Sequence, residues 1–236
     1  MRPALLFVMV LPVLAACRPS APDAALFPLT AGHRWTYRVV TRDDDGISQR
    51  ETLTLRTLGA ETAPELGNTP AWRRRSDDGV DYWLRADASG IYRVGSKSDV
   101  EDSPRPDQPH RYVLKAPYVP GTQWQSSTTS YLLMRRNEYP REIRHAAAGV
   151  TMSYQIEAVD QSVDVPAGHF EGCLRVVGTA TLRLYADPVK GWRDIPLVST
   201  EWYCARVGLV RLERSETARY AYVTGGTRTL ELESWQ

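Results

Sequence analysis

Most of this sequence alternates, residue by residue, between apolar or aromatic side chains and polar ones. The alternation is clear in residues 51–58, 150–159, 173–185 and 197–204, which are rich in Val, Thr, Tyr and Trp. Successive side chains of a β-strand point to opposite faces, so a period of two is typical of strands that bury one face. No segment sustains a 3.6-residue apolar period over three helical turns. The sequence therefore predicts an all-β, mostly antiparallel protein with a curved sheet.

Turn residues punctuate these stretches. Four dipeptides have the composition of tight turns between strands: Asp45-Gly46, Asp78-Gly79, Ser89-Gly90 and Gly225-Gly226. The strongest helical candidate is 141–148, which follows a proline and is at most two turns long. Little helix is expected after the N-terminal segment.

Residues 96–109 contain three prolines and only one apolar residue, Val100. This composition predicts a long flexible loop. We expect the loop to separate two similar halves of a single antiparallel β domain that covers residues 27–236.

Two sequence echoes flank this expected loop. The pattern P-x-x-x-G-x-x-W occurs at 28–35 and again at 117–124. In the first half, Tyr82-Trp83 is followed by a Gly and an apolar run. In the second half, Trp202-Tyr203 is likewise followed by a Gly and an apolar run, so both echoes occur in the same order. One interpretation is a duplicated half-sheet, and the other is a chance coincidence of common turn chemistry.

The N-terminus has the parts of a bacterial export signal. Arg2 supplies a positive charge, residues 4–14 are apolar, and small residues lead directly into Cys17. The apolar run is too short to span a hydrocarbon core of ~30 Å as a helix. Leu14-Ala15-Ala16-Cys17 resembles the lipobox of bacterial prolipoproteins. That resemblance implies removal of residues 1–16 and attachment of diacylglycerol and palmitate to Cys17.

Residues 17–26 are then a lipidated, proline-containing tether. Two or more acyl chains give stable residence on a membrane, whereas one does not. By resemblance to enteric lipoproteins, an aspartate after the cysteine would retain the protein at the inner membrane. Arg18 stands there instead. We therefore expect the protein in the bacterial cell envelope, lipid-anchored to the outer membrane and facing the periplasm.

The charge balance gives no electrostatic reason to bind nucleic acid. There are 29 basic and 28 acidic residues, a formal net charge of +1. The longest basic run is Arg73-Arg74-Arg75. In a strand these three side chains alternate between faces and form no patch. We expect no nucleic-acid partner.

The three cysteines divide into an anchor and a pair. With Cys17 lipidated, Cys173 and Cys204 remain, an even number in an oxidising compartment. An even pair in such a compartment favours a disulfide, provided that the strands bring the two residues together.

A predicted hairpin of strands 173–185 and 192–204 shows whether the two cysteines come together. If Tyr185 faces Trp192, each cysteine lies 12 residues from the facing pair, so the cysteines face each other too. Directly opposed residues have Cβ atoms within reach of a disulfide. A bulge at Pro196 would shift the register and break the pairing.

Two stretches resemble the motifs of a known family. Residues 165–176 read V-P-A-G-H-F-E-G-C-L-R-V, and 202–210 read W-Y-C-A-R-V-G-L-V. They resemble V-P-A-G-x-F-x-x-C-x-x-V and W-Y-A-x-x-V-G-L-V of uncharacterised bacterial envelope lipoproteins, over most of residues 26–234. Cys204 departs from the family, which more often has a small residue there. The resemblance implies a curved half-barrel similar to the lipoprotein carriers LolA and LolB, rather than any activity.

No residue pattern indicates catalysis or metal binding. The four histidines (His33, His110, His145 and His169) have no metal-ligand spacing. The run 43–46 lacks the alternating ligands and distal Glu of a calcium loop. Cys173 has only His169 nearby as a base, and a disulfide is the favoured role for that cysteine. We therefore expect a non-enzymatic protein with no metal and no cofactor.

Aromatic content supplies the remaining functional hypothesis. Seven Trp and twelve Tyr exceed the needs of a minimal core, although ordinary packing also explains them. The concave face of a curved sheet can hold an apolar ligand. The first hypothesis is an envelope lipoprotein that binds a lipid or another hydrophobic ligand. The alternative is a structural or scaffold lipoprotein for an envelope protein complex, with no small ligand. The sequence does not identify the ligand-binding residues.

Overall fold

The computed structural model describes residues 26–139, 141–143 and 149–236. The predicted signal peptide, Cys17 and all of the tether before residue 26 lie outside the described residues. The strands are β1 (Arg34–Asp43), β2 (Ser48–Glu61), β3 (Ala71–Ser76), β4 (Val80–Asp87), β5 (Gly90–Ser98), β6 (Arg105–Lys115), β7 (Gln123–Thr128), β8 (Met134–Arg135), β9 (Val150–Val165), β10 (Gly168–Asp187), β11 (Gly191–Cys204), β12 (Gly208–Arg219) and β13 (Val223–Trp235).

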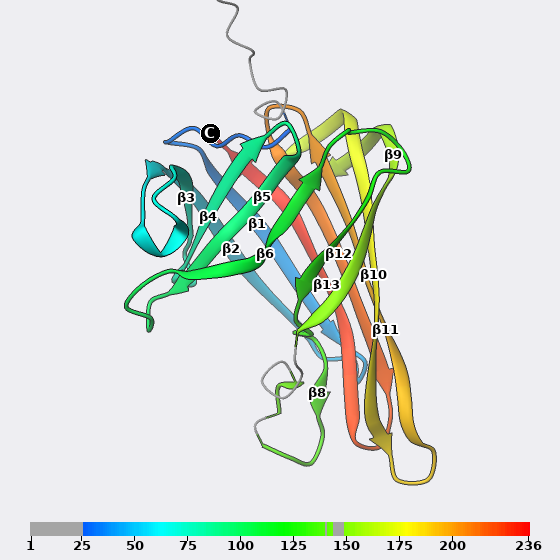
Figure 1. Cartoon of the computed structure of the whole chain (residues 1–236). Helices are drawn as coiled ribbons and strands as arrows, with labels where there is room; N and C mark the ends of the chain where they lie inside the picture. The colour runs from blue at the N-terminus through cyan, green and yellow to red at the C-terminus, as the bar shows by residue number, and fades with distance from the viewer. Residues whose placement is uncertain (1–25, 140, 144–148) are drawn as a thin grey trace, which may run out of the picture.

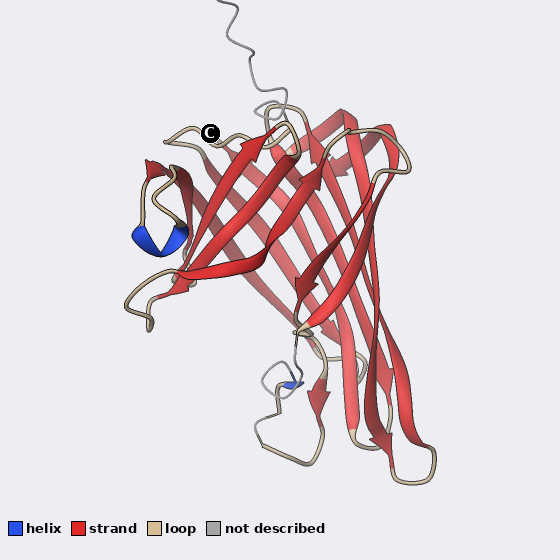
Figure 2. Cartoon of the chain, viewed as in Figure 1, coloured by secondary structure: helices blue, strands red, loops and turns tan. Residues whose placement is uncertain are grey.

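Helix is almost absent from these ranges (Figure 2). A one-turn 3-10 helix, Pro64–Leu66, lies between β2 and β3. Within the described ranges, no helix has the length and apolar character needed to cross a membrane.

All strands belong to one antiparallel sheet, in the order β6-β5-β4-β3-β2-β1-β13-β12-β11-β10-β9-β7, with β8 paired to β13. The sheet curls into a nearly closed barrel (Figure 1). The predicted all-β class and curved sheet are confirmed. The start of β1 and the C-terminus lie at the same end of the barrel, and the β10–β11 hairpin extends beyond most strands at the other end.

The two edge strands of the sheet, β6 and β7, meet through side chains and not through a backbone ladder. The Ser126 hydroxyl donates to the Tyr112 carbonyl at 3.1 Å, and the Arg111 guanidinium reaches the Thr128 hydroxyl at 3.5 Å. These contacts bring the first and last strands of the sheet order together, so the sheet has an interior and an exterior face.

The predicted flexible loop 96–109 is wrong in extent. β5 continues to Ser98 and β6 begins at Arg105, so only six residues connect them. Contrary to the expectation, the connection joins two neighbouring strands of the sheet and does not separate two halves. Pro106 and Pro109 lie within β6. A proline cannot donate to a sheet ladder, but an edge strand tolerates it on its unpaired side.

Three of the four predicted turn dipeptides connect strands, whereas Gly225-Gly226 lies within β13. A Cβ on Gly225 would overlap the carbonyl oxygen of Glu216, and one on Gly226 would overlap that of Arg42. These glycines therefore permit close strand approach and do not form a turn. Of the predicted helix 141–148, Glu142 forms a β-bridge with Met134, and residues 144–148 lie outside the described part.

The strand order consists of two six-strand meanders, β1–β6 and β7 with β9–β13. The Trp of each P-x-x-x-G-x-x-W pattern is the second residue of its first strand, Trp35 in β1 and Trp124 in β7. Tyr82-Trp83 and Trp202-Tyr203 each lie in the fourth strand, β4 and β11. These are the places that a duplication predicts, with β8 as an insertion. The duplication itself stays a prediction.

One core cluster spans both meanders. Leu84, Ile91 and Leu114 of the first meander pack in one cluster with Ile156 and Val176 of the second. A separate cluster surrounds the two paired cysteines. Because the first cluster needs both meanders, neither half has a complete hydrophobic core of its own.

Candidate ligand-binding cavity

A cavity of about 240 Å³ lies inside the barrel. Strands β6 and β11 are far apart in the sheet order, so a cavity that contacts both lies between opposite walls. The segment before β1 also contributes to it. The lining residues are Phe27, Tyr37, Leu55, Arg74, Tyr82, Leu84, Arg93, Arg111, Val113, Tyr203 and Leu209.

Most of this lining is aliphatic or aromatic. The Tyr37 hydroxyl donates to the Leu209 carbonyl at 2.8 Å, and the Tyr203 hydroxyl donates to the Glu201 carboxylate at 2.5 Å. Burial raises the pKa of both phenols, so they stay neutral. With these hydroxyls engaged, the two tyrosines present mainly apolar rings to the cavity.

Arg74 is the exception in this wall. Its side chain is buried, and its guanidinium carbon lies 4.2 Å from the Phe27 ring centroid and 4.3 Å from that of Trp35. One terminal nitrogen donates to the Pro28 carbonyl at 2.8 Å, while Nε is buried without a hydrogen-bond partner. Burial lowers the pKa of Arg74 to about 10, so the guanidinium is still charged at neutral pH.

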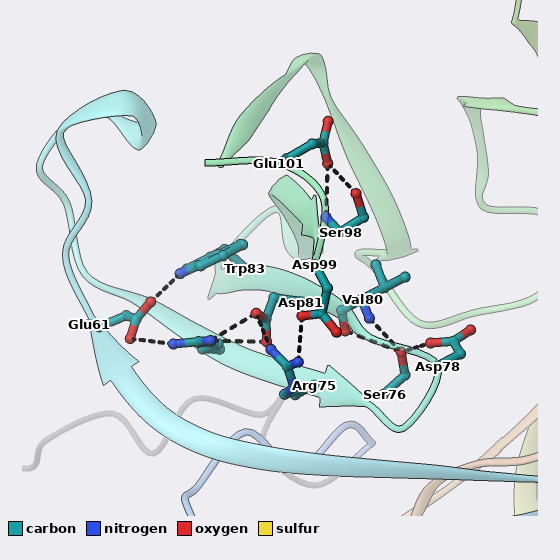
Figure 3. A network of polar contacts seen from close by, with 11 residues as sticks. Glu61, Arg75, Ser76, Asp78, Val80, Asp81, Trp83, Ser98, Asp99 and Glu101 are labelled. Carbon is teal, nitrogen blue, oxygen red and sulfur yellow. Dashed lines mark hydrogen bonds and ion pairs between the residues drawn. The ribbon is translucent and has the colours of Figure 1, made fainter. Parts of the chain in front are cut away.

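The strand pattern explains why a cation is inside. In β3, Arg74 points to the interior, whereas Arg73 and Arg75 point to the exterior, as the predicted alternation requires. On the exterior, Arg73 donates to the buried Asp81 carboxylate at 2.8 Å and Arg75 donates to it at 2.9 Å (Figure 3). Asp99 accepts a further bond from Arg75. The outer arginines are therefore neutralised, and Arg74 is not.

The two other arginines of the cavity differ in the same way. Arg93 forms a bidentate pair with Asp107 at 2.6 and 2.8 Å. Arg111 has only the long contact to the Thr128 hydroxyl. Among the described residues, no carboxylate lies within 4.0 Å of Arg74 or Arg111. The apolar cavity therefore carries two cationic groups without counter-ions.

Two further carboxylates are buried, and only one of them has a cationic partner among the described residues. Glu216 accepts from Arg214 at 2.8 Å, from the Ser130 hydroxyl at 2.7 Å and from two backbone N–H groups. Glu201, which is also buried, accepts from the Ser199 and Tyr203 hydroxyls. Glu216 is therefore paired with a cation, whereas Glu201, next to the cavity residue Tyr203, has only neutral hydroxyl partners among the described residues.

The predicted disulfide between Cys173 and Cys204 is present, with Cα atoms 4.2 Å apart. The predicted register is confirmed, since Tyr185 pairs with Trp192. Pro196 pairs with Thr181 without a bulge. Along β11, pairing with β12 begins only at Val198, so the missing N–H of Pro196 disrupts no ladder on that side.

The histidines lie in separate places. His33 contacts the Gln236 carbonyl at 3.3 Å, His110 stacks on Tyr92, and His169 pairs with Asp164 at 2.7 Å. His145 lies outside the described residues. In the part of the chain that the structure describes, no three His, Cys, Asp or Glu side chains converge as metal ligands.

The acidic run 43–46 serves the turn and its neighbours. Asp43 accepts from the backbone N–H groups of Asp45 and Ile47, Asp44 accepts from that of Ala218, and Asp45 pairs with Arg136. The predicted turn role of this run is therefore confirmed.

Arg74 and Arg111 were not identified as candidate site residues from the sequence. A signal was present for Arg74, because it shares a strand face with Trp72 and Ser76 inside a run of alternating residues. The alternation places the three side chains on one face, but it does not say that this face is the interior of the barrel.

No family model matches the chain, and no curated protein matches it significantly. A candidate lipoprotein from Parabacteroides distasonis aligns over 90% of this chain and 98% of its own, with 16% identity and a TM-score of 0.38. A candidate exported protein with a YmcC-like fold, from Bacteroides fragilis, aligns over 90% and 99%, with 16% identity and a TM-score of 0.39. Such scores support no argument about function. The resemblance to envelope lipoprotein motifs and to LolA and LolB stays a prediction.

Proposed function

We propose that this chain is a lipid-anchored envelope protein that binds a hydrophobic ligand inside its barrel. The observation that supports the proposal is the cavity between β1–β6 and β11–β12, with its apolar and aromatic lining. Ligand sites are typically concave and mostly apolar, with a few polar groups that orient the ligand. This cavity has that composition.

The cavity size restricts the ligand. A volume of about 240 Å³ holds on the order of eight water-sized groups at about 30 Å³ each. A methylene group is of similar size, so one short acyl chain, or part of a longer one, fits. A complete two-chain lipid does not fit in this conformation. The proposed ligand is therefore a single-chain molecule or one chain of a lipid.

The position of the cavity suits a lipid-anchored protein. Phe27 lines the cavity, and Leu26 is the first described residue. Cys17, the proposed lipidation site, precedes Leu26 by nine residues, which span at most about 30 Å. The proposed anchor therefore holds the segment that lines the cavity close to a membrane. We propose the outer membrane, facing the periplasm.

Lipid mass spectrometry of protein purified from native membranes tests this function. Val113 lines the cavity, whereas Val198 is an exposed residue of β11. We expect a single-chain amphiphile to co-purify with the wild type and with Val198→Phe, and to be lost from Val113→Phe because the added ring occupies the cavity. A protein that carries no ligand, or equal ligand in both variants, would contradict the proposal.

A scaffold function is the second candidate, and a separate observation favours it. Tyr185, Trp192 and Tyr222 form an exposed ring cluster near the tip of the β10–β11 hairpin, with Tyr185 50% and Trp192 59% exposed. Exposed aromatic clusters are typical of protein interfaces. Crosslinking in cells tests this: a stoichiometric protein partner lost in Trp192→Ala supports a scaffold, and no partner in the wild type argues against it.

A further inference from the structure

We infer that the ligand of the barrel cavity is an anionic amphiphile, whose carboxylate or phosphate group pairs with Arg74 and Arg111 while its chain lies against the aromatic wall. This inference rests on the proposed function and adds the charge and head group of the ligand. Four observations about the cavity support it.

The first observation is the uncompensated charge of Arg74. Burial of an isolated charge is costly unless a counter-ion or hydrogen bonds replace water. The rings of Phe27 and Trp35 offset part of this cost through cation–π contacts. Nε nevertheless stays buried with no acceptor. An anion in the cavity would supply the acceptor and the counter-charge together.

The second observation is that Arg111 is also without a counter-ion. Among the described residues, its hydrogen-bond partner is the neutral hydroxyl of Thr128 at 3.5 Å. Arg93, on the neighbouring strand, is different, because Asp107 binds it in a bidentate pair. We take such a paired arginine to have a structural role. Within the described part of the chain, the cavity therefore contains one guanidinium paired with a carboxylate and two that have no carboxylate partner.

The third observation is the donor geometry. A guanidinium presents five N–H donors in a planar fork that matches carboxylate and phosphate oxygens. Arg74 uses one of its nitrogens on the Pro28 carbonyl. The remaining donors of both side chains exceed the acceptors that the described residues offer them. A hydrocarbon would leave them unpaired, and a neutral alcohol would supply a single hydroxyl acceptor and no counter-charge.

The fourth observation concerns the rest of the ligand. Leu55, Leu84, Val113 and Leu209 line the same cavity as the arginines. A free inorganic anion would leave this apolar surface uncovered, whereas a chain attached to the anion covers it. The apolar residues and the arginines of the lining together favour an amphiphile over a small ion.

Three probes with the same chain separate these requirements: octanoate, octyl phosphate and octanol. The protein is the full mature chain with Cys17→Ser, which alters only the tether and avoids detergent. Trp35 contacts Arg74, so tryptophan emission reports binding next to it. We expect the tighter of the two anions to bind at least about tenfold better than octanol, as charge-assisted hydrogen bonds imply. The preferred anion identifies the head group.

Arg111→Met is the informative variant, because Arg111 is half-buried and has no strong partner to lose. We expect its affinity for the anions to fall toward that for octanol, with the remainder of the anion preference due to Arg74. Arg183→Met is the control, since it removes the same charge from an exposed site that is 69% accessible. We expect Arg183→Met to bind all three probes as the wild type does.

The outcomes distinguish this inference from the function on which it rests. If octanol binds and neither anion binds better, the inferred charge is wrong and the apolar cavity function stands. If none of the three probes binds, the proposed function fails as well. If Arg183→Met weakens anion binding as much as Arg111→Met does, the effect is one of net charge, and the assignment to Arg111 is wrong.

Discussion

The guanidinium of Arg74 packs on the ring of Phe27, 4.2 Å from its centroid, and the same side chain donates to the carbonyl of Pro28. Through these contacts, β3 holds the segment that precedes β1. Because that segment follows the predicted tether directly, any pull on the tether acts first on Phe27. Phe27 and Arg74 thus line the cavity and also fix the segment to which the predicted tether is joined.

Substitution of Phe27 measures this attachment. Phe27→Leu retains an apolar side chain but removes the ring under a buried cation, a contact worth roughly 2 kcal/mol when desolvated. We expect a loss of about 2 kcal/mol in the free energy of unfolding, measured with urea. Leu29→Met is the control, a buried neighbour without a guanidinium contact. Equal losses in the two variants would show that the ring contact is not specific.

The disulfide is expected to contribute strongly to stability. Its cysteines are 31 residues apart, and closing such a loop in the unfolded chain corresponds to about 3–4 kcal/mol. We expect the double variant Cys173→Ala, Cys204→Ala to lose about that much in urea unfolding. Reductant should destabilise the wild type and leave the double variant unchanged. Mass spectrometry that finds two free thiols in the mature protein would refute the bond.

The buried pair of Arg214 and Glu216 should be sensitive to loss of one partner. Glu216→Gln preserves shape but leaves Arg214, which is 3% exposed, without its counter-ion. Breaking a buried pair in this way costs roughly 3–5 kcal/mol. Asp194→Asn removes a carboxylate from an exposed pair with Arg183, and we expect no measurable change. Calorimetry of both variants checks the contrast.

Stability should fall above pH 10. Burial raises the pKa of Tyr131 to about 12, and it also raises the pKa values of Tyr37, Tyr154 and Tyr203. Unfolded tyrosines ionise near pH 10, so the stability that these groups contribute is complete below that value. It is lost as the pH rises toward the folded pKa values.

One group in the cavity opposes this trend. Burial lowers the pKa of Arg74 from its usual value to about 10, so its unfavourable burial is relieved as the pH rises above about 10. Four tyrosines outweigh one arginine, and the net change is destabilising. Melting temperatures from pH 8 to 12, with tyrosinate absorbance recorded in parallel, check the prediction. Constant melting temperatures through this range would contradict it.

The lipid anchor is tested at Cys17. Growth with labelled palmitate should label the wild-type protein, and Cys17→Ser should abolish both the label and membrane association. Arg18→Asp is the informative companion variant. If Arg18 favours the outer membrane, the aspartate should move the labelled protein toward the inner-membrane fraction. Label on Cys17→Ser would place the acyl chain on another residue.

Local periodicity was sufficient to predict the strands, because an amphipathic β pattern depends only on neighbouring residues. It also predicted the pairing of Cys173 with Cys204, since a hairpin register depends on the distance to one turn. It failed at 96–109, where prolines indicated a loop. The identity of β6 as an edge strand, which tolerates Pro106, depends on the order of the whole sheet.

The candidate site was less predictable, because it too depends on the order of the whole sheet and not on neighbouring residues. Alternation separates Arg74 from Arg73 and Arg75, but only the closed sheet brings it beside Phe27 and makes its face the interior. Arg111 comes from β6 and Leu209 from β12, and nothing in the local sequence relates them. The cavity therefore exists only at the level of the tertiary fold.

The pairing of β1 with β13 has a kinetic consequence. Trp35 lies beside Trp235 across this ladder, so the first strand to be synthesised pairs with the last. Until β13 emerges, β1 offers an unpaired strand edge to any other chain nearby. Such distant pairing slows folding and prolongs exposure to aggregation. The barrel therefore cannot close until the last strand is available, and the edge of β1 stays exposed until then.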